Sequence, residues 1–369
     1  MPKIQHRQKI EFNIWVEDKN SVDYYLMDKQ FIDCFTSIKV RYKTIYEDNF
    51  EPGHNFIIIP IESLQDVPED VSNQIKAFSN EHDVKIIIAC GSKTFTWSDD
   101  TLAMWREHNK IPDVKIFVNG LVSDNDIIAV PSYISKLYNW YGEELEDEFL
   151  HSFNVLAEEI NFKFSVQFGK MNETKKEVLK ELFNQQVFQN CDSFWHTLHV
   201  NDIEEGRKFY KENTNSTTQI VDRVYTNEIF HIDKYTEKDW WATYPWQLKF
   251  SCLNLAIEDT SIPTITEHLL KSLMLGQPVV WIAHPKLLDY LNELGFTTYA
   301  WMKYDFDYIM DKSERIESAI KELKRQVLNP EFILYTRKHT YWTNKKNKEN
   351  FNKLAREDIC LDKFLEKIN

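Results

Sequence analysis

The first 130 residues alternate between short apolar runs and polar, helix-like stretches. Five of the apolar runs are rich in β-branched residues and nearly continuous, which is typical of strands buried on both faces of a sheet. These runs are residues 12–16, 56–60, 84–90, 114–118 and 127–130. Between them, residues 71–82 and 99–108 have the spacing of amphipathic helices. This order predicts a parallel sheet flanked by helices.

The same alternation resumes in the second half of the chain. Residues 162–168 (FKFSVQF) predict a strand, and residues 173–185 predict the helix that follows it. Residues 250–259 and 277–282 predict two more strands, joined by a helix over 266–275. His196 and His199 are three residues apart, which fits one face of a helix. No metal-ligand spacing accompanies them, so no metal site is expected.

Two halves with the same order of elements predict an α/β fold with two Rossmann-like domains. Their parallel sheets are expected to face a central cleft, with ligands at the carboxyl ends of the strands. The expected parts are an N-terminal domain over 1–155, a C-terminal domain over 156–330 and a helical tail over 331–369. In the tail, residues 345–348 (KKNK) are interpreted as a solvated turn, with a phosphate contact as the alternative.

The amino-acid composition excludes several kinds of binding site. The 369 residues carry 44 Lys+Arg against 58 Asp+Glu, a formal net charge of -14, which argues against a broad cationic surface but not against a local basic groove. With only 8 Gly and no GxGxxG or GxxxxGK[ST] pattern, a glycine-rich phosphate loop is not expected. Five scattered Cys indicate reduced thiols in a cytoplasmic protein. No apolar run is long enough to span a bilayer, and the N-terminus does not resemble a signal peptide.

The segment from residue 250 onward contains the most informative candidate site. Its strand ends at Glu258, and the next helix begins at Thr266, a residue type that caps helix N-termini. The N–H groups of a helix N-terminus attract an anion, and Lys271 would add a positive charge there. Glu267 could accept hydrogen bonds from ribose hydroxyls. The same residues would equally suit an ordinary helix cap and a solvated lysine.

This segment resembles the donor-binding signature of alpha-1,3-fucosyltransferase-like glycosyltransferases. The resemblance rests on FSCLNLAIED, ITEH and GQPVV, which are residues 250–259, 265–268 and 276–280. Residues 291–299, 304–308 and 314–316 are similar to stretches of glycosyltransferase-like proteins from large bacteriophages and giant viruses. His268 stands where the family pattern has Lys, so Lys271 or a protonated His268 would have to make the phosphate contact.

The resemblance implies a GT-B fold that holds a UDP- or GDP-sugar mainly in its C-terminal domain and transfers a hexosyl or pentosyl group. It implies no required cofactor or metal. In a GT-B C-terminal domain the first strand–helix turn faces the diphosphate, which adds Gly169 and Lys170 as candidates, with a surface lysine as the alternative. The full set of expected donor-binding residues is Gly169, Lys170, Glu258, Thr266, Glu267, His268 and Lys271.

An inverting transfer also needs a general base beside the acceptor hydroxyl. In this fold the base is expected at the carboxyl end of an N-terminal-domain strand, where Glu17 and Asp18 directly follow residues 12–16. Solvated loop carboxylates are the alternative. Asp305 and Asp307 match the DxD metal motif, but their position after the donor signature indicates a structural connection.

The expected activity is therefore transfer of a sugar to an acceptor hydroxyl in the cytoplasm, or in the host cytoplasm if the protein is viral. The viral resemblance favours a hydroxymethylated pyrimidine of bacteriophage DNA as acceptor. A surface polysaccharide or another glycan is one alternative. A non-catalytic nucleotide-binding interaction protein on a GT-B scaffold is another. The oligomeric state stays open.

Overall fold

A computed structural model gives the architecture of the chain. The residues that the structure describes are 8–16, 31–44, 54–60, 69–82, 84–89, 107, 114–121, 123, 127–141, 162–169, 172–191, 194–198, 251–258, 263–275, 277–329 and 332–368. The chain divides into two compact units. The first comprises residues 1–139, 260–264 and 352–369, and the second comprises residues 140–259 and 265–351. The domain boundaries expected at residues 155 and 330 stay a prediction.

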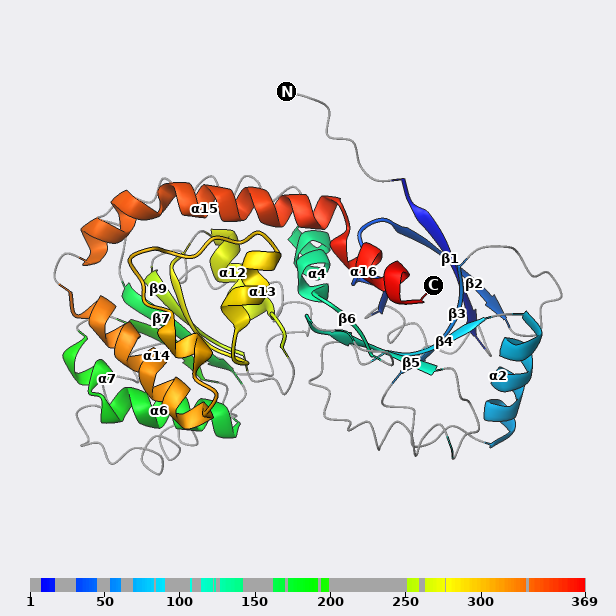
Figure 1. Ribbon diagram of the computed structural model, residues 1–369, viewed down its shortest axis with the longest axis horizontal. Helices are drawn as coiled ribbons and strands as arrows, with labels where there is room; N and C mark the ends of the chain where they lie inside the picture. The colour runs from blue at the N-terminus through cyan, green and yellow to red at the C-terminus, as the bar shows by residue number, and fades with distance from the viewer. Residues whose placement is uncertain are drawn as a thin grey trace, which may run out of the picture. The chain divides into compact units, whose positions relative to one another are not determined.

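Among the described residues of the first unit, six strands form a sheet in the order β2-β1-β3-β4-β5-β6, and every neighbouring pair is parallel (Figure 1). The strands are β1 Ile10–Val16, β2 Ile38–Thr44, β3 His54–Pro60, β4 Lys85–Ala89, β5 Val114–Asn119 and β6 Ile127–Val130. β2 lies outside the predicted strands. It is an edge strand in which Lys39, Arg41 and Lys43 alternate with apolar residues, so it has no continuous apolar run.

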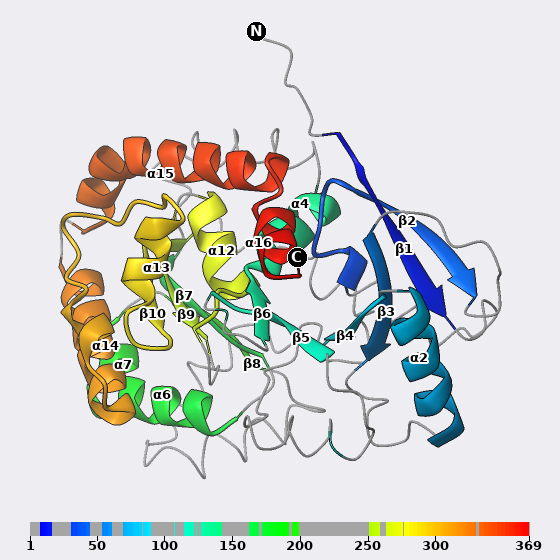
Figure 2. The same ribbon diagram turned by 45° about the vertical axis from the view of Figure 1, so that its right-hand side comes forward.

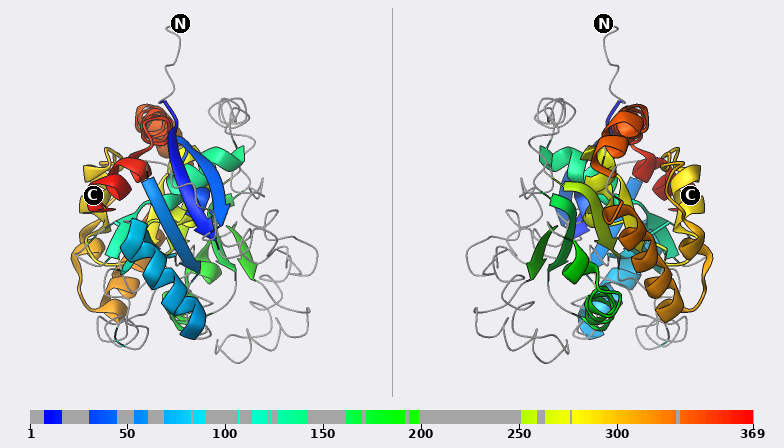
Figure 3. Two further views of the ribbon diagram at one scale, coloured as in Figure 1. Left: turned by 90° about the vertical axis from the view of Figure 1, so that its right-hand side faces the viewer. Right: turned by 90° about the vertical axis from the view of Figure 1, so that its left-hand side faces the viewer.

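Helices cover both faces of this sheet. On one face, Phe364 of α16 (Ile359–Ile368) contacts five phenylalanine rings with centroids 5.4–5.8 Å away. These rings belong to Phe12, Phe31, Phe35, Phe56 and Phe117. On the other face, Phe78 of α2 (Glu69–His82) packs on Trp15 with the ring centroids 4.8 Å apart. Figure 3 shows α2 in blue beside the strands of this unit. A further helix, α4 (Ser132–Tyr141), follows β6 directly.

The end of the chain is part of this core, although the sequence suggests a separate tail. Asp358, at the turn before α16, has a left-handed backbone with φ of 52°. Its carboxylate accepts hydrogen bonds from the N–H groups of Thr36 (2.8 Å), Ser37 (2.7 Å) and Leu361 (3.1 Å). Asp358 therefore links the C-terminal helix to the segment that precedes β2.

In the second unit, four described strands form a parallel sheet in the order β10-β9-β7-β8. They are β7 Phe162–Gly169, β8 Phe194–Leu198, β9 Ser251–Ile257 and β10 Val279–Ile282. Strands β7, β9 and β10 follow the predicted runs. β8 contains His196, so the helix expected around that residue is wrong. Two parallel sheets in two Rossmann-like units confirm the predicted α/β class.

The described helices of the second unit follow its strands. They are α6 Glu173–Asn184, α7 Val187–Asn190, α12 Glu267–Leu275, α13 Leu287–Glu293, the 3-10 helix η4 Asp305–Tyr308 and α14 Lys312–Val327. Helix α15 (Phe332–Arg356) begins in the second unit, and its last residues belong to the first. Residues 345–348 lie inside α15, so the solvated turn expected there is wrong. No described helix is both long and apolar enough to cross a membrane.

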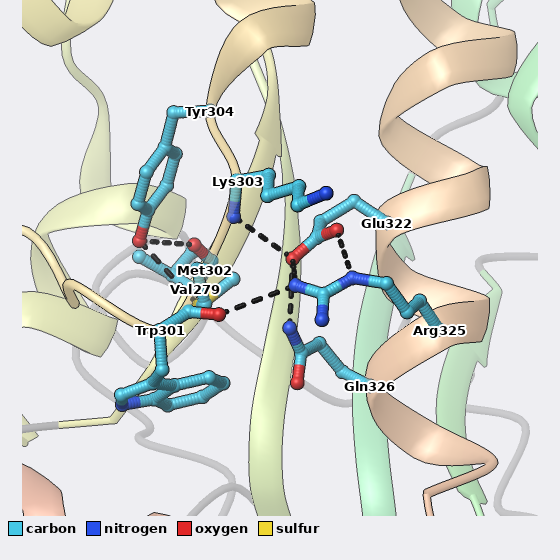
Figure 4. A network of polar contacts seen from close by, with 8 residues as sticks. All are labelled: Val279, Trp301, Met302, Lys303, Tyr304, Glu322, Arg325 and Gln326. Carbon is cyan, nitrogen blue, oxygen red and sulfur yellow. Dashed lines mark hydrogen bonds and ion pairs between the residues drawn. The ribbon is translucent and has the colours of Figure 1, made fainter.

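A polar network fixes α14 to the segment that precedes η4 (Figure 4). The buried carboxylate of Glu322 accepts from the backbone N–H of Lys303 (3.0 Å), from Gln326 (2.7 Å) and from Arg325. Arg325 also donates to the carbonyl of Trp301 (3.2 Å). The donors to Glu322 lie on α14 itself and on the segment that precedes η4. The network therefore provides hydrogen bonds to a buried carboxylate and links the two elements.

Candidate functional site

The second sheet reverses its direction of winding between β7 and β9. The chain runs from β7 through α6 to β8 on one side, and from β9 through α12 to β10 on the other. Right-handed crossovers in opposite directions place α6 and α12 on opposite faces of the sheet, as Figure 2 shows. In open parallel sheets, ligands bind outside the carboxyl ends of the strands at such a point. The sheet order therefore marks the end of β7 and β9 as the candidate site.

Glu258, the residue that directly follows β9, lies at this point and is 3% exposed. Its Oε1 accepts hydrogen bonds from the N–H groups of Thr266 (3.1 Å) and Leu269 (3.2 Å) at the start of α12. Its Oε2 is buried and has no hydrogen-bond partner among the described residues. Burial raises the pKa of Glu258 to about 7, and the charge of Glu267 adds to the rise, while the hydrogen bonds from Thr266 and Leu269 act in the opposite direction.

The chain itself caps the N-terminus of α12. Thr266 Oγ1 accepts from the N–H of His268 (3.3 Å), which is the capping role that the sequence predicts for Thr266. Because the N–H groups of Thr266 and Leu269 donate to Glu258, three donors of this helix end are already in use. The helix end is therefore less available to a diphosphate than the sequence suggests, and the side chains around it become the candidate ligand contacts.

Glu267, the first residue of α12, is 5% exposed. Its Oε1 lies 3.3 Å from Nε2 of His268, and its Oε2 is a second buried carboxyl oxygen that has no partner in the described part of the chain. Burial lowers the pKa of His268 to about 4, and Lys175 and Lys271 lower it further against the opposing charge of Glu267. This lowered pKa favours the neutral imidazole at pH 7, and a phosphate contact of His268 stays a prediction.

Lys271 lies one helical turn after Glu267 and is 3% exposed. Burial lowers its pKa to about 8, and the charge of Glu267 acts against this fall. At neutral pH Lys271 is therefore mostly protonated and places a positive charge beside Glu267. Its burial excludes the alternative of a solvated lysine at this position.

Lys175 is a residue of this site that sequence reasoning missed. It lies in the first turn of α6, where its N–H donates to Oδ1 of the N-cap residue Asn172 (2.9 Å). Its charge acts on His268, so the N-termini of α6 and α12 bring positive charge to the same edge of the sheet. The sequence pattern that could have indicated Lys175 is Asn172-Glu173-Thr174-Lys175. It places a lysine in the first turn of the helix that follows the predicted strand 162–168, with a typical N-cap residue before it.

A chain of buried polar side chains fixes the position of α12 on the sheet. Ser165 of β7 donates to Oδ1 of Asn254 on β9 (3.2 Å), and Asn254 donates through Nδ2 to Oγ of Ser272 on α12. Ser272 donates in turn to the carbonyl of His268 (3.3 Å). These bonds link the two strands of the switch point to the helix that carries Glu267 and Lys271.

Of the other predicted site residues, the structure describes only Gly169. Gly169 is the last residue of β7, just after a shift in the register between β7 and β8. Lys170, Glu17 and Asp18 lie outside the described residues, so their roles stay predictions. β1, which precedes Glu17 and Asp18, ends at Val16 as the sequence indicates.

Asp307 of the DxD sequence has a structural role. It is 1% exposed, its Oδ1 accepts from Nε1 of Trp281 (2.6 Å), and its Oδ2 accepts from the N–H of Leu288 (2.8 Å). Both carboxylate oxygens are therefore engaged within the chain. Across the described ranges, no group of three or more His, Cys, Asp or Glu side chains is arranged to hold a metal ion.

Comparisons with known proteins give little sequence similarity. No protein-family model matches the chain, and no curated protein matches its sequence. Among solved structures it is similar to a UDP-GlcNAc 2-epimerase from Methanocaldococcus jannaschii, with 11% identity, a TM-score of 0.37, and coverage of 95% of this chain and 99% of the other.

Two further solved structures are similar over most of the chain. An alpha,alpha-trehalose 6-phosphate synthase from Burkholderia multivorans has 8% identity, a TM-score of 0.44, and coverage of 98% and 96%. An O-GlcNAc transferase mutant from Thermobaculum terrenum has 10% identity, a TM-score of 0.35, and coverage of 96% and 68%. These TM-scores are below 0.5, so the α/β assignment rests on the two parallel sheets themselves.

Proposed function

We propose that the chain is a GT-B glycosyltransferase that transfers a hexosyl or pentosyl group from a UDP- or GDP-sugar to an acceptor hydroxyl. The observation that carries the proposal is a pair of buried carboxyl oxygens, one of Glu258 and one of Glu267, at the switch point of the second sheet, neither of which has a hydrogen-bond partner among the described residues. Buried acceptors without donors are costly, and a ligand with adjacent hydroxyl groups would satisfy both. A ribose has such a pair of hydroxyls.

The cations beside these carboxyl groups support a nucleotide rather than a neutral sugar alone. Lys271 lies next to Glu267, and Lys175 reaches the same edge from α6. Together with Lys170 and Gly169 in the turn after β7, they would bind the diphosphate and stabilise the charge that develops as it leaves. Thr266 and His268 shape the helix end that holds Glu267. No metal ion or further cofactor is required by this arrangement.

The first unit would supply the acceptor side of the reaction. Glu17 or Asp18, directly after β1, is the proposed general base. Closure of two domains over a cleft would exclude water, which otherwise competes as acceptor. Residues 1–155, 156–330 and 331–369 are the proposed acceptor domain, donor domain and tail.

The identity of the acceptor is a separate part of the proposal. A hydroxymethylated pyrimidine of bacteriophage DNA, modified in the host cytoplasm, follows from the viral resemblance within residues 291–316. The net charge of -14 favours the alternative, a surface polysaccharide or other glycan. A second candidate function is a non-catalytic nucleotide-binding protein, which would retain the contacts of Glu258 and Lys271 but lack a base.

The test is to incubate the full chain with a panel of UDP- and GDP-sugars, alone, with hydroxymethylated DNA and with glycan acceptors, and to measure release of the nucleoside diphosphate. Acceptor-dependent release that is lost in Glu267→Gln supports the transferase. Nucleotide binding without release under any condition favours the non-catalytic protein. If calorimetry shows that neither UDP nor GDP binds, the proposed function fails.

A further inference from the structure

Helix α15 has the opposite charge to the rest of the chain. Between Phe332 and Arg356 it carries seven Lys and Arg residues and a single Glu. The chain as a whole has a formal net charge of -14. A strongly basic helix in an acidic protein is a candidate surface for an anionic partner.

The inward and outward faces of α15 have different compositions. On the inward face, Asn344 accepts from the hydroxyl of Tyr299 (2.6 Å), and Asn347 bonds both backbone groups of Thr297 (2.7 and 2.9 Å). Phe351 is buried on the same face. These contacts attach α15 to the second unit through polar and apolar side chains, and its lysines are not needed for that packing.

The outward face combines lysines with a tryptophan. Lys345, Lys346, Glu349 and Lys353 are exposed at helical spacing, and Trp342 is 75% exposed. Trp342 is the most exposed of the large hydrophobic side chains in the described part of the chain. The ammonium of Lys345 lies 5.7 Å from the centre of its ring, over the indole face. Tryptophan favours the interface of a membrane, where one part of its ring is in an apolar environment and its N–H reaches polar groups, and lysines are attracted to anionic headgroups.

We propose that the outward face of α15, defined by Trp342, Lys345, Lys346 and Lys353, binds the surface of an anionic lipid membrane. The lysines would lie among the anionic headgroups while their methylene stems and Trp342 reach the boundary with the acyl chains. Each lysine near an anionic surface contributes about 5-fold in affinity. A face with three of them and one tryptophan therefore gives reversible, salt-sensitive binding.

A nucleic acid fits this face less well. The indole of Trp342 would have to stack on an unpaired base, but Lys345 lies over its ring. The exposed cations of the face are all lysines, which lack the bidentate geometry of arginine for phosphates and base edges. Glu349 on the same face weakens binding to either polyanion.

The test uses the full chain and vesicles of phosphatidylcholine with or without phosphatidylglycerol, with co-sedimentation as the readout. The wild type should sediment with the phosphatidylglycerol vesicles at low salt, be released at high salt and ignore pure phosphatidylcholine. Lys345→Glu combined with Lys346→Glu should lower the affinity roughly 25-fold or more, at about 5-fold per lost cation. Trp342→Ser should lower it as well.

The matched control is Lys180→Glu combined with Lys303→Glu, the same change of charge at two exposed positions outside α15. It should bind vesicles much more tightly than the α15 pair, and circular dichroism should show both variants folded. The proposal is overturned if the wild type does not sediment with anionic vesicles, or if the two double variants bind equally. Binding of a DNA duplex or single strand that depends on Lys345 and Lys346, without vesicle binding, would assign the face to nucleic acid instead.

Discussion

Replacing Glu258 with Gln should stabilise the fold at alkaline pH while it weakens nucleotide binding. Gln keeps an oxygen that can accept from the N–H groups of Thr266 and Leu269, and it removes the ionisable group from a site that is 3% exposed. A buried Glu whose two oxygens both have hydrogen-bond donors would instead lose stability when it is replaced by Gln. Removing a charge that has satisfied partners costs stability.

The magnitude follows from the raised pKa of Glu258, about 7 in the folded protein against 4.5 for an ordinary Glu. Below pH 4.5 the carboxyl is protonated in both the folded and the unfolded chain, and its ionisation does not affect stability. Between pH 4.5 and 7 the unfolded chain ionises first, so the wild type progressively loses stability. Above pH 7 the full loss of about 3 kcal/mol is reached. Glu258→Gln does not undergo this loss.

Urea unfolding of the wild type and Glu258→Gln at pH 5 and pH 8 measures the effect. The free energy of unfolding of the variant relative to the wild type should increase by about 2–3 kcal/mol from pH 5 to pH 8. The matched control is Glu322→Gln, a buried Glu whose oxygens already accept from Lys303, Arg325 and Gln326, and it should be less stable than the wild type at pH 8. An equal loss of stability for Glu258→Gln at both pH values would refute the raised pKa of Glu258.

The packing within the two units gives three further predictions. Asp307→Ala should lower the free energy of unfolding by about 2–4 kcal/mol, since Trp281 Nε1 and a backbone N–H lose their buried acceptor; urea unfolding with no loss would show that these bonds contribute nothing. Gly295→Ala should cost about 1–2 kcal/mol, because φ is +81° and the new Cβ would lie 3.0 Å from Oδ1 of Asn350; an unchanged melting temperature would argue against this strain. Asp358→Ala should cost about 2–4 kcal/mol, because three backbone N–H groups lose one acceptor, and thermal unfolding at wild-type temperature would contradict the anchoring of α16.

The strands were the most predictable part of the fold. Buried parallel strands need apolar side chains on both faces, so β3, β4 and β9 appear in the sequence as short runs of apolar, often β-branched residues. β2 has no such run because it lies at an edge and alternates with Lys and Arg. The helical character of residues 331–369 was predicted, but residues 345–348 were interpreted as a turn, because the inward face of α15 there relies on asparagines, which give no apolar periodicity.

The site was predictable only in part. Thr266 as an N-cap follows from local sequence, since the cap and the helix are adjacent in the chain. The bond between Glu258 and the N–H of Leu269 crosses a loop, so the sequence does not show that the helix end is already occupied. Burial, and with it the neutral state of His268, is likewise a property of the packed site and not of the residue. Lys175 joins the site because β7 and β9 are neighbours in the sheet, which depends on strand order.

The central claim, that a nucleotide binds at the carboxyl ends of β7 and β9, is tested most directly by amide hydrogen exchange of the full chain with and without UDP or GDP. The account predicts slower exchange in peptides that cover the start of α12 around Glu267 and the start of α6 around Lys175, with little change in β1 or α16. Binding of either nucleotide with protection elsewhere, and none at these two helix ends, would contradict it.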